Sequence, residues 1–284
     1  MKNLITNYSH KITAEKKWFD LNLREIWNYR DLLWLFVKRD VTTFYKQTIL
    51  GPLWFLLQPL ITTIVFSFIF NKIAKISTDQ TPPYLFYMSG IIAWNYFSDC
   101  LMSTSNTFTS NAYIFSKVYF PRLIIPFSQI ISNLVKMFVQ LSLFFCLLIY
   151  YQVYEDQVFF IYRNIILLPI IIIQMGLLGV AIGMIVSSLT TKYRDLRFLV
   201  SFSVQLLMYA TPVAYPLSAV PEKYKIFVLY NPMTSIIVSF RNSLLGKENL
   251  DPIFFYYSFL SISLLFLVGL IFFNRVEKTF IDTV

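Results

Sequence analysis

Six long apolar stretches divide this chain, and each is about long enough to cross a bilayer as a helix. They run approximately over 53–70, 84–108, 124–150, 165–189, 198–213 and 253–273. A helix needs about 20 mostly apolar residues to span roughly 30 Å of hydrocarbon. The pattern therefore predicts an all-α membrane protein with six transmembrane helices.

An amphipathic stretch precedes the first of these spans. Apolar positions recur there at intervals of three and four residues, which places them on one face of a helix. They are Leu33, Phe36, Val37, Val41, Phe44 and Thr48. Basic and polar residues, including Arg39 and Lys46, occupy the other face. Such a helix lies along a membrane surface, and Gly51-Pro52 ends it.

The segment from about 211 to 252, between the fifth and sixth spans, has two interpretations. It is rich in prolines, yet 226–245 is apolar enough to enter the membrane. A seventh span would place the basic C-terminus outside and would bury Arg241 in lipid. A re-entrant helical hairpin avoids both, because irregular backbone at membrane depth persists where protein surrounds it. We therefore expect a re-entrant hairpin.

Composition and charge fix the class and the orientation. Hydrophobic residues make up 57% of the 284 residues and charged residues only 14%, too little polar surface for a soluble globule. With both ends in the cytoplasm, sixteen Lys and Arg lie inside and seven outside, as the positive-inside rule requires. The net charge of +9 then reflects topology, and no nucleic-acid partner is expected. We expect 1–50 to be a cytoplasmic segment and 51–284 one transmembrane domain.

The sequence contains few of the residue patterns that enzymes use for catalysis, metal binding or nucleotide binding. There is one His, no Cys or His cluster and no GxxxxGK[ST] phosphate loop. Gly176, Gly179 and Gly183 are spaced for close helix packing. The 15 acidic residues are scattered. We therefore expect no catalytic residue, metal or cofactor in this chain.

Two ionisable residues fall inside the predicted spans. Asp99 lies nine residues from the inner end of the second span, and Lys136 twelve residues from the inner end of the third. At 1.5 Å per residue these depths are roughly 14 and 18 Å. Isolated charges at membrane depth are costly. Either the two side chains pair across neighbouring helices, or each faces a wet channel separately.

Aromatic residues make up 19% of the chain, and two groups stand beside polar residues. Much of this content is typical of lipid contact and interfacial belts. Rings beside hydroxyl and amide groups also suit a sugar polymer, whose C–H faces stack on them. The candidate channel residues are Trp94, Tyr96 and Phe97 in the second span, and Tyr209, Tyr215, Tyr224 and Tyr230 near the predicted hairpin.

Several short motifs occur in a characteristic order along the chain. Near the first span they are Arg39-Asp40, Tyr45-Lys46-Gln47, Leu50-Gly51-Pro52-Leu53-Trp54 and Gln58-Pro59-Leu60. Later come Tyr193-Arg194-Asp195, Thr211-Pro212-Val213-Ala214-Tyr215-Pro216 and Asn231-Pro232-Met233. In order, spacing and topology the chain resembles, from about residue 24 to its end, the permease subunit of type-2 ABC exporters for bacterial surface polysaccharides: O-antigen, teichoic acid and capsule.

That resemblance implies a type-2 ABC exporter fold in the bacterial cytoplasmic membrane, with a homodimer around a continuous channel. Two copies of a separate ATPase subunit would use ATP and Mg, and an undecaprenyl-linked polysaccharide would be the cargo, with O-antigen favoured over teichoic acid and capsule. The interfacial helix, with Arg39 and Lys46, and the turn 111–122, with Lys117 and Arg122, would receive the motion of the ATPase. Simple cytoplasmic anchoring by Lys117 and Arg122 fits equally well. Segment 211–252 would contain the outer gate.

Three other functions remain open at this point. An exporter of the same superfamily for a drug or small lipid would need a narrow apolar path. A secondary transporter or channel would need no ATPase. A lipid-linked sugar transferase would need clustered carboxylates for a metal and a sugar nucleotide.

Overall fold

The computed structural model describes residues 23–46, 51, 53–115, 117–155, 165–193, 195–246 and 251–280. In that part of the chain all assigned secondary structure is helical and no strand is assigned. The all-α prediction is therefore confirmed. The first 22 residues of the predicted cytoplasmic segment and Thr48 of the amphipathic stripe lie outside the described residues.

The predicted apolar stretches coincide with helices. The first half of the chain forms α1 (Leu23–Asn28), α2 (Arg30–Lys46), α3 (Leu53–Phe66), the π-helical turn η1 (Ser67–Ile73), α4 (Pro83–Ser105), α5 (Thr107–Ser110), α6 (Ala112–Phe115) and α7 (Ile124–Tyr154). The second half forms η2 (Ile165–Leu167), α8 (Leu168–Thr190), α9 (Leu196–Ala210), η3 (Leu217–Ala219), α10 (Glu222–Leu229), α11 (Pro232–Leu245) and α12 (Pro252–Phe280).

Four described helical segments are long and apolar enough to cross a membrane, namely Leu53–Ile73, Ile124–Tyr154, Ile165–Thr190 and Pro252–Val276. The other two predicted spans correspond to α4, which carries polar residues, and α9, which has only 15 residues. The protein is therefore an integral membrane protein. Six spans, and the re-entrant placement of α10 and α11, stay predictions.

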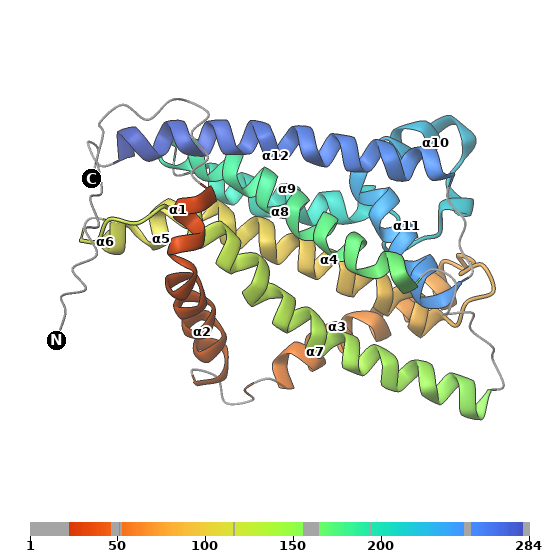
Figure 1. Ribbon diagram of the computed structural model, residues 1–284. Helices are drawn as coiled ribbons and strands as arrows, with labels where there is room; N and C mark the ends of the chain where they lie inside the picture. The colour runs from red at the N-terminus through yellow and green to blue at the C-terminus, as the bar shows by residue number, and fades with distance from the viewer. Residues whose placement is uncertain are drawn as a thin grey trace.

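The long helices lie side by side, and α4 and α8 run through the middle of the bundle (Figure 1). The last turns of α12 lie at the same end as α1, α5 and α6, whereas α10 and α11 lie at the opposite end. α2 leaves the bundle at a steep angle beside α7. The two ends of the bundle therefore differ: α1, α5 and α6 lie at one end, and the short helices α10 and α11 lie at the other.

Glycines on α8 allow it to approach α4 closely. A Cβ on Gly179 would lie 2.7 Å from the carbonyl oxygen of Phe97, and one on Gly183 would lie 2.6 Å from Cβ of Thr104. Real Cβ atoms do not come this near to such neighbours. The predicted packing role of these glycines is confirmed, as expected for small residues at helix interfaces in membranes.

Candidate functional site

The central helix α4 is buried along most of its length, but one stripe of it remains partly exposed. Between 85 and 105 the residues that are not buried are Asn95, Ser98, Asp99, Met102 and Ser103. Steps of three and one place them on a single helical face, and four of the five are polar. The rest of α4 packs against other helices of the bundle, chiefly α8 and α7. The stripe is the face of α4 that is available to another molecule.

The polar stripe on α4 is linked to α7 and α3. Lys136 on α7 places its Nζ 3.5 Å from Oδ2 of Asp99. The same ammonium lies 5.7 Å from the centre of the Phe55 ring on α3. Asn133 Nδ2, one turn before Lys136, donates to Ser103 Oγ at 3.1 Å. The two ionisable side chains that the sequence placed at similar depths are therefore within ion-pair distance. Asp99 nevertheless keeps 44% of its side chain exposed, against 17% for Lys136.

The aromatic candidates on α4 lie inside the protomer. Trp94, Tyr96 and Phe97 retain only 4%, 2% and 3% of their surface. The ring of Trp94 packs 5.2 Å from that of Phe97, and a Cβ on Gly176 would come within 2.7 Å of the Tyr96 hydroxyl. Because α8 and other helices cover this side of α4, the three rings support the polar stripe from behind and present no surface for a polymer.

The tyrosines of the opposite end are more open. Tyr209, Tyr224 and Tyr230 expose more than half of their surface, and Tyr230 packs edge to face on Tyr257 at 5.2 Å. Tyr215 is only partly exposed, and burial raises the pKa of its phenol above the ordinary value, so the hydroxyl stays neutral and able to donate. These four residues lie apart in sequence from the stripe on α4, between the end of α9 and the start of α11.

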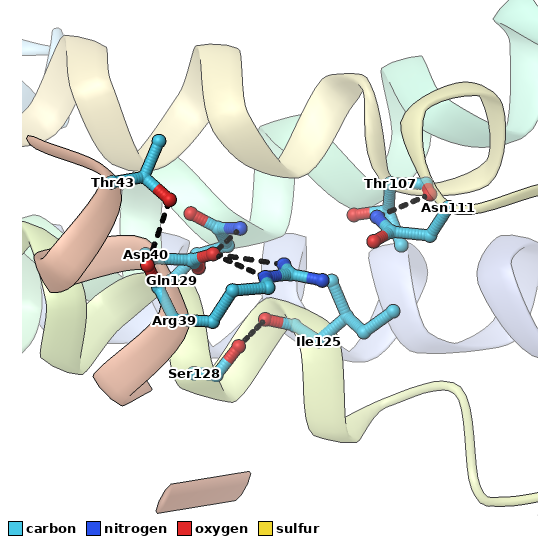
Figure 2. A network of polar contacts seen from close by, with 8 residues as sticks. All are labelled: Arg39, Asp40, Thr43, Thr107, Asn111, Ile125, Ser128 and Gln129. Carbon is cyan, nitrogen blue, oxygen red and sulfur yellow. Dashed lines mark hydrogen bonds and ion pairs between the residues drawn. The ribbon is translucent and has the colours of Figure 1, made fainter. Parts of the chain in front are cut away.

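The helix α2 matches the predicted interfacial helix and is docked on α7. Phe36 and Val37 of its apolar stripe are buried. On its polar side the Asp40 carboxylate receives Arg39 Nη2 at 2.8 Å and Gln129 Nε2 of α7 at 3.3 Å (Figure 2). Thr43 Oγ1 donates to the Arg39 carbonyl oxygen at 2.9 Å. Asp40 thus joins α2 to the first turns of α7.

A groove of about 660 Å³ separates α2 from the turn 111–122. Its walls are mainly apolar, with Leu32, Leu35 and Phe36 on one side and Ile114, Val118 and Phe120 on the other. Arg39, Lys38 and two threonines, all from α2, add polar groups to its lining. This end of the molecule therefore offers an apolar cleft with basic residues from one helix.

The four predicted coupling residues have different surroundings. Arg39 lines the groove, and Lys46 is exposed at the last residue of α2. Lys117 is exposed and lies 3.8 Å from the centre of the Tyr113 ring. Arg122 retains only 5% of its surface and lies against the rings of Phe108 and Phe115. Lys117 is thus open at the surface, whereas Arg122 is enclosed.

Sequence reasoning missed two parts of this arrangement. It did not identify Gln129 as the partner of Asp40, and no local signal marks that residue, because the contact joins positions 89 apart. It named Asp99 but did not join it with its neighbours into one stripe, although the three-and-four spacing of Asn95, Asp99 and Met102 was visible. The described residues include no group of three or more His, Cys, Asp or Glu able to hold a metal.

Comparison with known proteins now gives the family. A family model described as ABC-2 type transporter matches residues 31–245. The chain belongs to this family. It is 30% identical over 256 residues to an O-antigen export system permease protein RfbA of Klebsiella pneumoniae, covering 89% of this chain and 94% of that protein. It is 26% identical over 221 residues to a protein of the same name from Myxococcus xanthus, covering 77% and 82%.

The resemblance drawn from the motifs near the first span is therefore confirmed. As an ABC-2 permease, the chain is a membrane component of a transporter and not itself the ATPase. The matched residues 31–245 include α2, the polar stripe on α4, the groove beside α2 and the tyrosines of the opposite end.

Proposed function

We propose that this chain is the transmembrane subunit of an ATP-driven exporter of lipid-linked polysaccharide, with O-antigen as the cargo. Two copies would form the path, and two copies of a separate ATPase subunit would drive it with ATP and Mg. Export would run outward across the bacterial cytoplasmic membrane, with both ends of the chain in the cytoplasm. The names of the relatives support the cargo.

The observation that carries this proposal is the polar stripe on α4. Asp99 keeps 44% of its side chain open on a helix in the middle of a membrane bundle. Such groups are rarely exposed to lipid, and they face a protein interior or a water-filled cavity. The bundle of one chain leaves the stripe uncovered. A second copy facing it would enclose a wet path between the two protomers.

The chemistry of the stripe suits a sugar polymer. Its amide, hydroxyl and carboxylate groups accept and donate hydrogen bonds of the kind that sugar hydroxyls make. Tyr209, Tyr215, Tyr224 and Tyr230 would then guide the polymer at the outer end by stacking, which tolerates different sugar units. Trp94, Tyr96 and Phe97 would hold α4 in place behind the stripe.

The groove between α2 and the turn 111–122 is the proposed contact with the ATPase. Its apolar walls fit a hydrophobic anchor of a partner, and its residues include Arg39, with Lys117 exposed on the turn itself. A movement of the partner would reach the bundle through Asp40 and Gln129, which join α2 to α7.

The test is deletion of the gene in the native host, with the fate of the surface polysaccharide followed by fractionation and carbohydrate staining. Lipid-linked polymer should accumulate on the cytoplasmic side and reach the surface again when the wild-type gene returns. Surface polysaccharide that stays normal, in a strain without a second exporter, would contradict polymer export and favour a drug or small-lipid cargo. Export that persists when the neighbouring ATPase is inactivated would favour a secondary transporter.

A further inference from the structure

The segment 211–220 joins α9 to the short helices at the outer end, and its first four residues are buried without forming a regular helix. α9 ends at Ala210, and Pro212 and Pro216 prevent its continuation. Thr211, Val213 and Ala214 expose 2% or less of their surface. A buried non-helical backbone needs partners for its carbonyl groups. The first question is therefore which side chains supply them.

Arg241 on α11 supplies two of these partners. Its Nη2 donates to the carbonyl oxygens of Pro212 and Val213, both at 3.0 Å. The guanidinium carbon lies 3.8 Å from the centre of the Phe86 ring on α4. Arg241 retains only 1% of its surface, and a Cβ on Gly90 would come within 2.7 Å of its Nη2. The start of the segment is thus fixed to two helices at once.

A second contact from α11 strengthens this anchor. Asn231, the residue before α11, donates from Nδ2 to Thr211 Oγ1 at 3.0 Å, and its Oδ1 accepts from the backbone of Met233 at 3.0 Å. The side chain of Asn231 therefore caps α11 and also forms a hydrogen bond with Thr211 of the segment. Residues 211–213 are therefore held by Arg241 within α11 and by Asn231 at its start.

The far part of the segment is held in a different way. Ser218 is exposed, and its Oγ lies 2.8 and 2.7 Å from the two carboxylate oxygens of Asp79. The backbone hydrogen bonds of Ala219 and Val220 run to residues 216 and 217 of the same segment. Exposed polar contacts of this kind contribute little to stability, because water replaces them readily. This contact is therefore easily broken.

Asp79 belongs to a strained loop that follows the first span. Lys75, Asp79 and Gln80 have φ values of 53°, 47° and 60°, a conformation that costs non-glycine residues energy. The loop follows η1, a π-helical turn at the end of α3, and such turns frequently mark functional positions. α3 in turn follows α2 along the chain.

We propose that 211–220 is a flap of the outer gate, anchored at its start by Arg241 and Asn231 and latched at its far end by the Asp79–Ser218 contact. Opening breaks the latch while the anchor holds. This inference rests on the proposed function, and Asp79, Ser218 and Arg241 act in it as positioning residues. Tyr215 lies between anchor and latch, so its exposure reports the state of the flap.

The test uses cysteines in the full transporter in its native membrane. Asp79→Cys and Ser218→Cys are combined in a Cys146→Ser background, because Cys146 is exposed whereas Cys100 is buried. A short bifunctional thiol reagent links the pair, and a reductant releases it. The matched control links Glu222→Cys with Lys225→Cys, which lie one turn apart on α10 and form an ion pair at 2.9 Å.

Linking residue 79 to residue 218 should lower the surface export of polymer at least several-fold, and the reductant should restore it. Linking the control pair should leave export unchanged. Unchanged export in the linked protein would overturn the latch, and failure of the pair to link would show that the two positions are not neighbours and would overturn it too. If the unmodified chain itself exports no polymer, the proposed function fails instead.

The anchor is tested by labelling Tyr215→Cys with an impermeant maleimide. Arg241→Lys keeps the charge but removes the planar guanidinium, whose Nη2 bonds both carbonyl oxygens and whose face lies on Phe86, so labelling should rise several-fold. Phe86→Leu removes the ring under Arg241 and serves where the first variant does not accumulate. Unchanged labelling in both variants would contradict the anchor.

Discussion

Lys136 on α7 and Asp99 on α4 approach within 3.5 Å, and they do so at the edge of the one stripe of α4 that is not buried. The pair therefore belongs both to the helix packing and to the open face. A purely structural pair would be enclosed, whereas Asp99 keeps 44% of its side chain exposed.

Reversal of this pair tests whether the two charges act together. Asp99→Lys and Lys136→Asp should each lower the amount of protein in the membrane or its export several-fold, because each leaves two like charges at membrane depth. The double exchange should recover most of the loss, as measured by immunoblot and surface polysaccharide. A double exchange no better than the worse single variant would mean that the groups act separately.

The polar stripe itself is tested by Asn95→Leu. The change removes an amide from the proposed path but adds no strain at a partly exposed position, so export should fall several-fold while the protein level stays constant. Ser142→Leu, an exposed polar position on α7, is the matched control and should have little effect. Equal export in the two variants would remove Asn95 from the path.

The connection between α2 and α7 is tested by Asp40→Leu. Loss of the carboxylate removes the hydrogen bond from Gln129 and loosens the polar side of the contact between α2 and α7, so ATP hydrolysis by the complex should continue while export falls. Asp31→Leu is the control, because Asp31 is 94% exposed on the same helix. The measurement is the amount of polymer exported per ATP hydrolysed in proteoliposomes. An unchanged ratio for Asp40→Leu would show that the contact between Asp40 and Gln129 transmits no motion.

Lys117 and Arg122 should differ although both lie in the turn 111–122. Lys117→Glu should lower export per ATP and leave the protein level unchanged, because the side chain is exposed. Arg122→Ala should lower the protein level, since burial between Phe108 and Phe115 makes such cation–ring contacts worth about 2 kcal/mol. Equal behaviour of both variants would support simple cytoplasmic anchoring.

The contact between α4 and α8 should not tolerate a larger residue. Gly183→Leu places new atoms where even a Cβ lies 2.8 Å from the carbonyl oxygen of Leu101, and overpacking of this kind costs about 1–3 kcal/mol or more. The temperature at which detergent-solubilised protein loses its fold should fall. No fall in that temperature would mean that the two helices separate without cost.

The helices could be predicted from the sequence because their signals are local. The period of apolar residues predicted an amphipathic helix before the first span, which is α2. The spacing of Gly176, Gly179 and Gly183 predicted close helix packing, and the structure places these residues against α4. The depth argument brought Asp99 and Lys136 to the same level. Each of these inferences uses residues within one helix or a distance along its axis.

The remainder depends on how helices face one another, which a single sequence does not encode locally. Trp94 and Phe97 read as channel residues because of their type, yet α8 and its neighbours enclose them. Arg241 counted as a loop charge, although the apolar run around it was a signal that it is buried. The contact between Asp79 and Ser218 joins residues 139 apart, and only the fold brings them together.

The burial of α4 also has a consequence for biosynthesis. α4 is not among the described helices that are long and apolar enough to cross a membrane, so its own transfer from the translocon into lipid is weakly favoured. Its main neighbours, α7 and α8, follow it in the chain. Stable burial of α4 therefore waits for the synthesis of α7 and α8, and the nascent chain stays vulnerable to quality control until α8 has emerged.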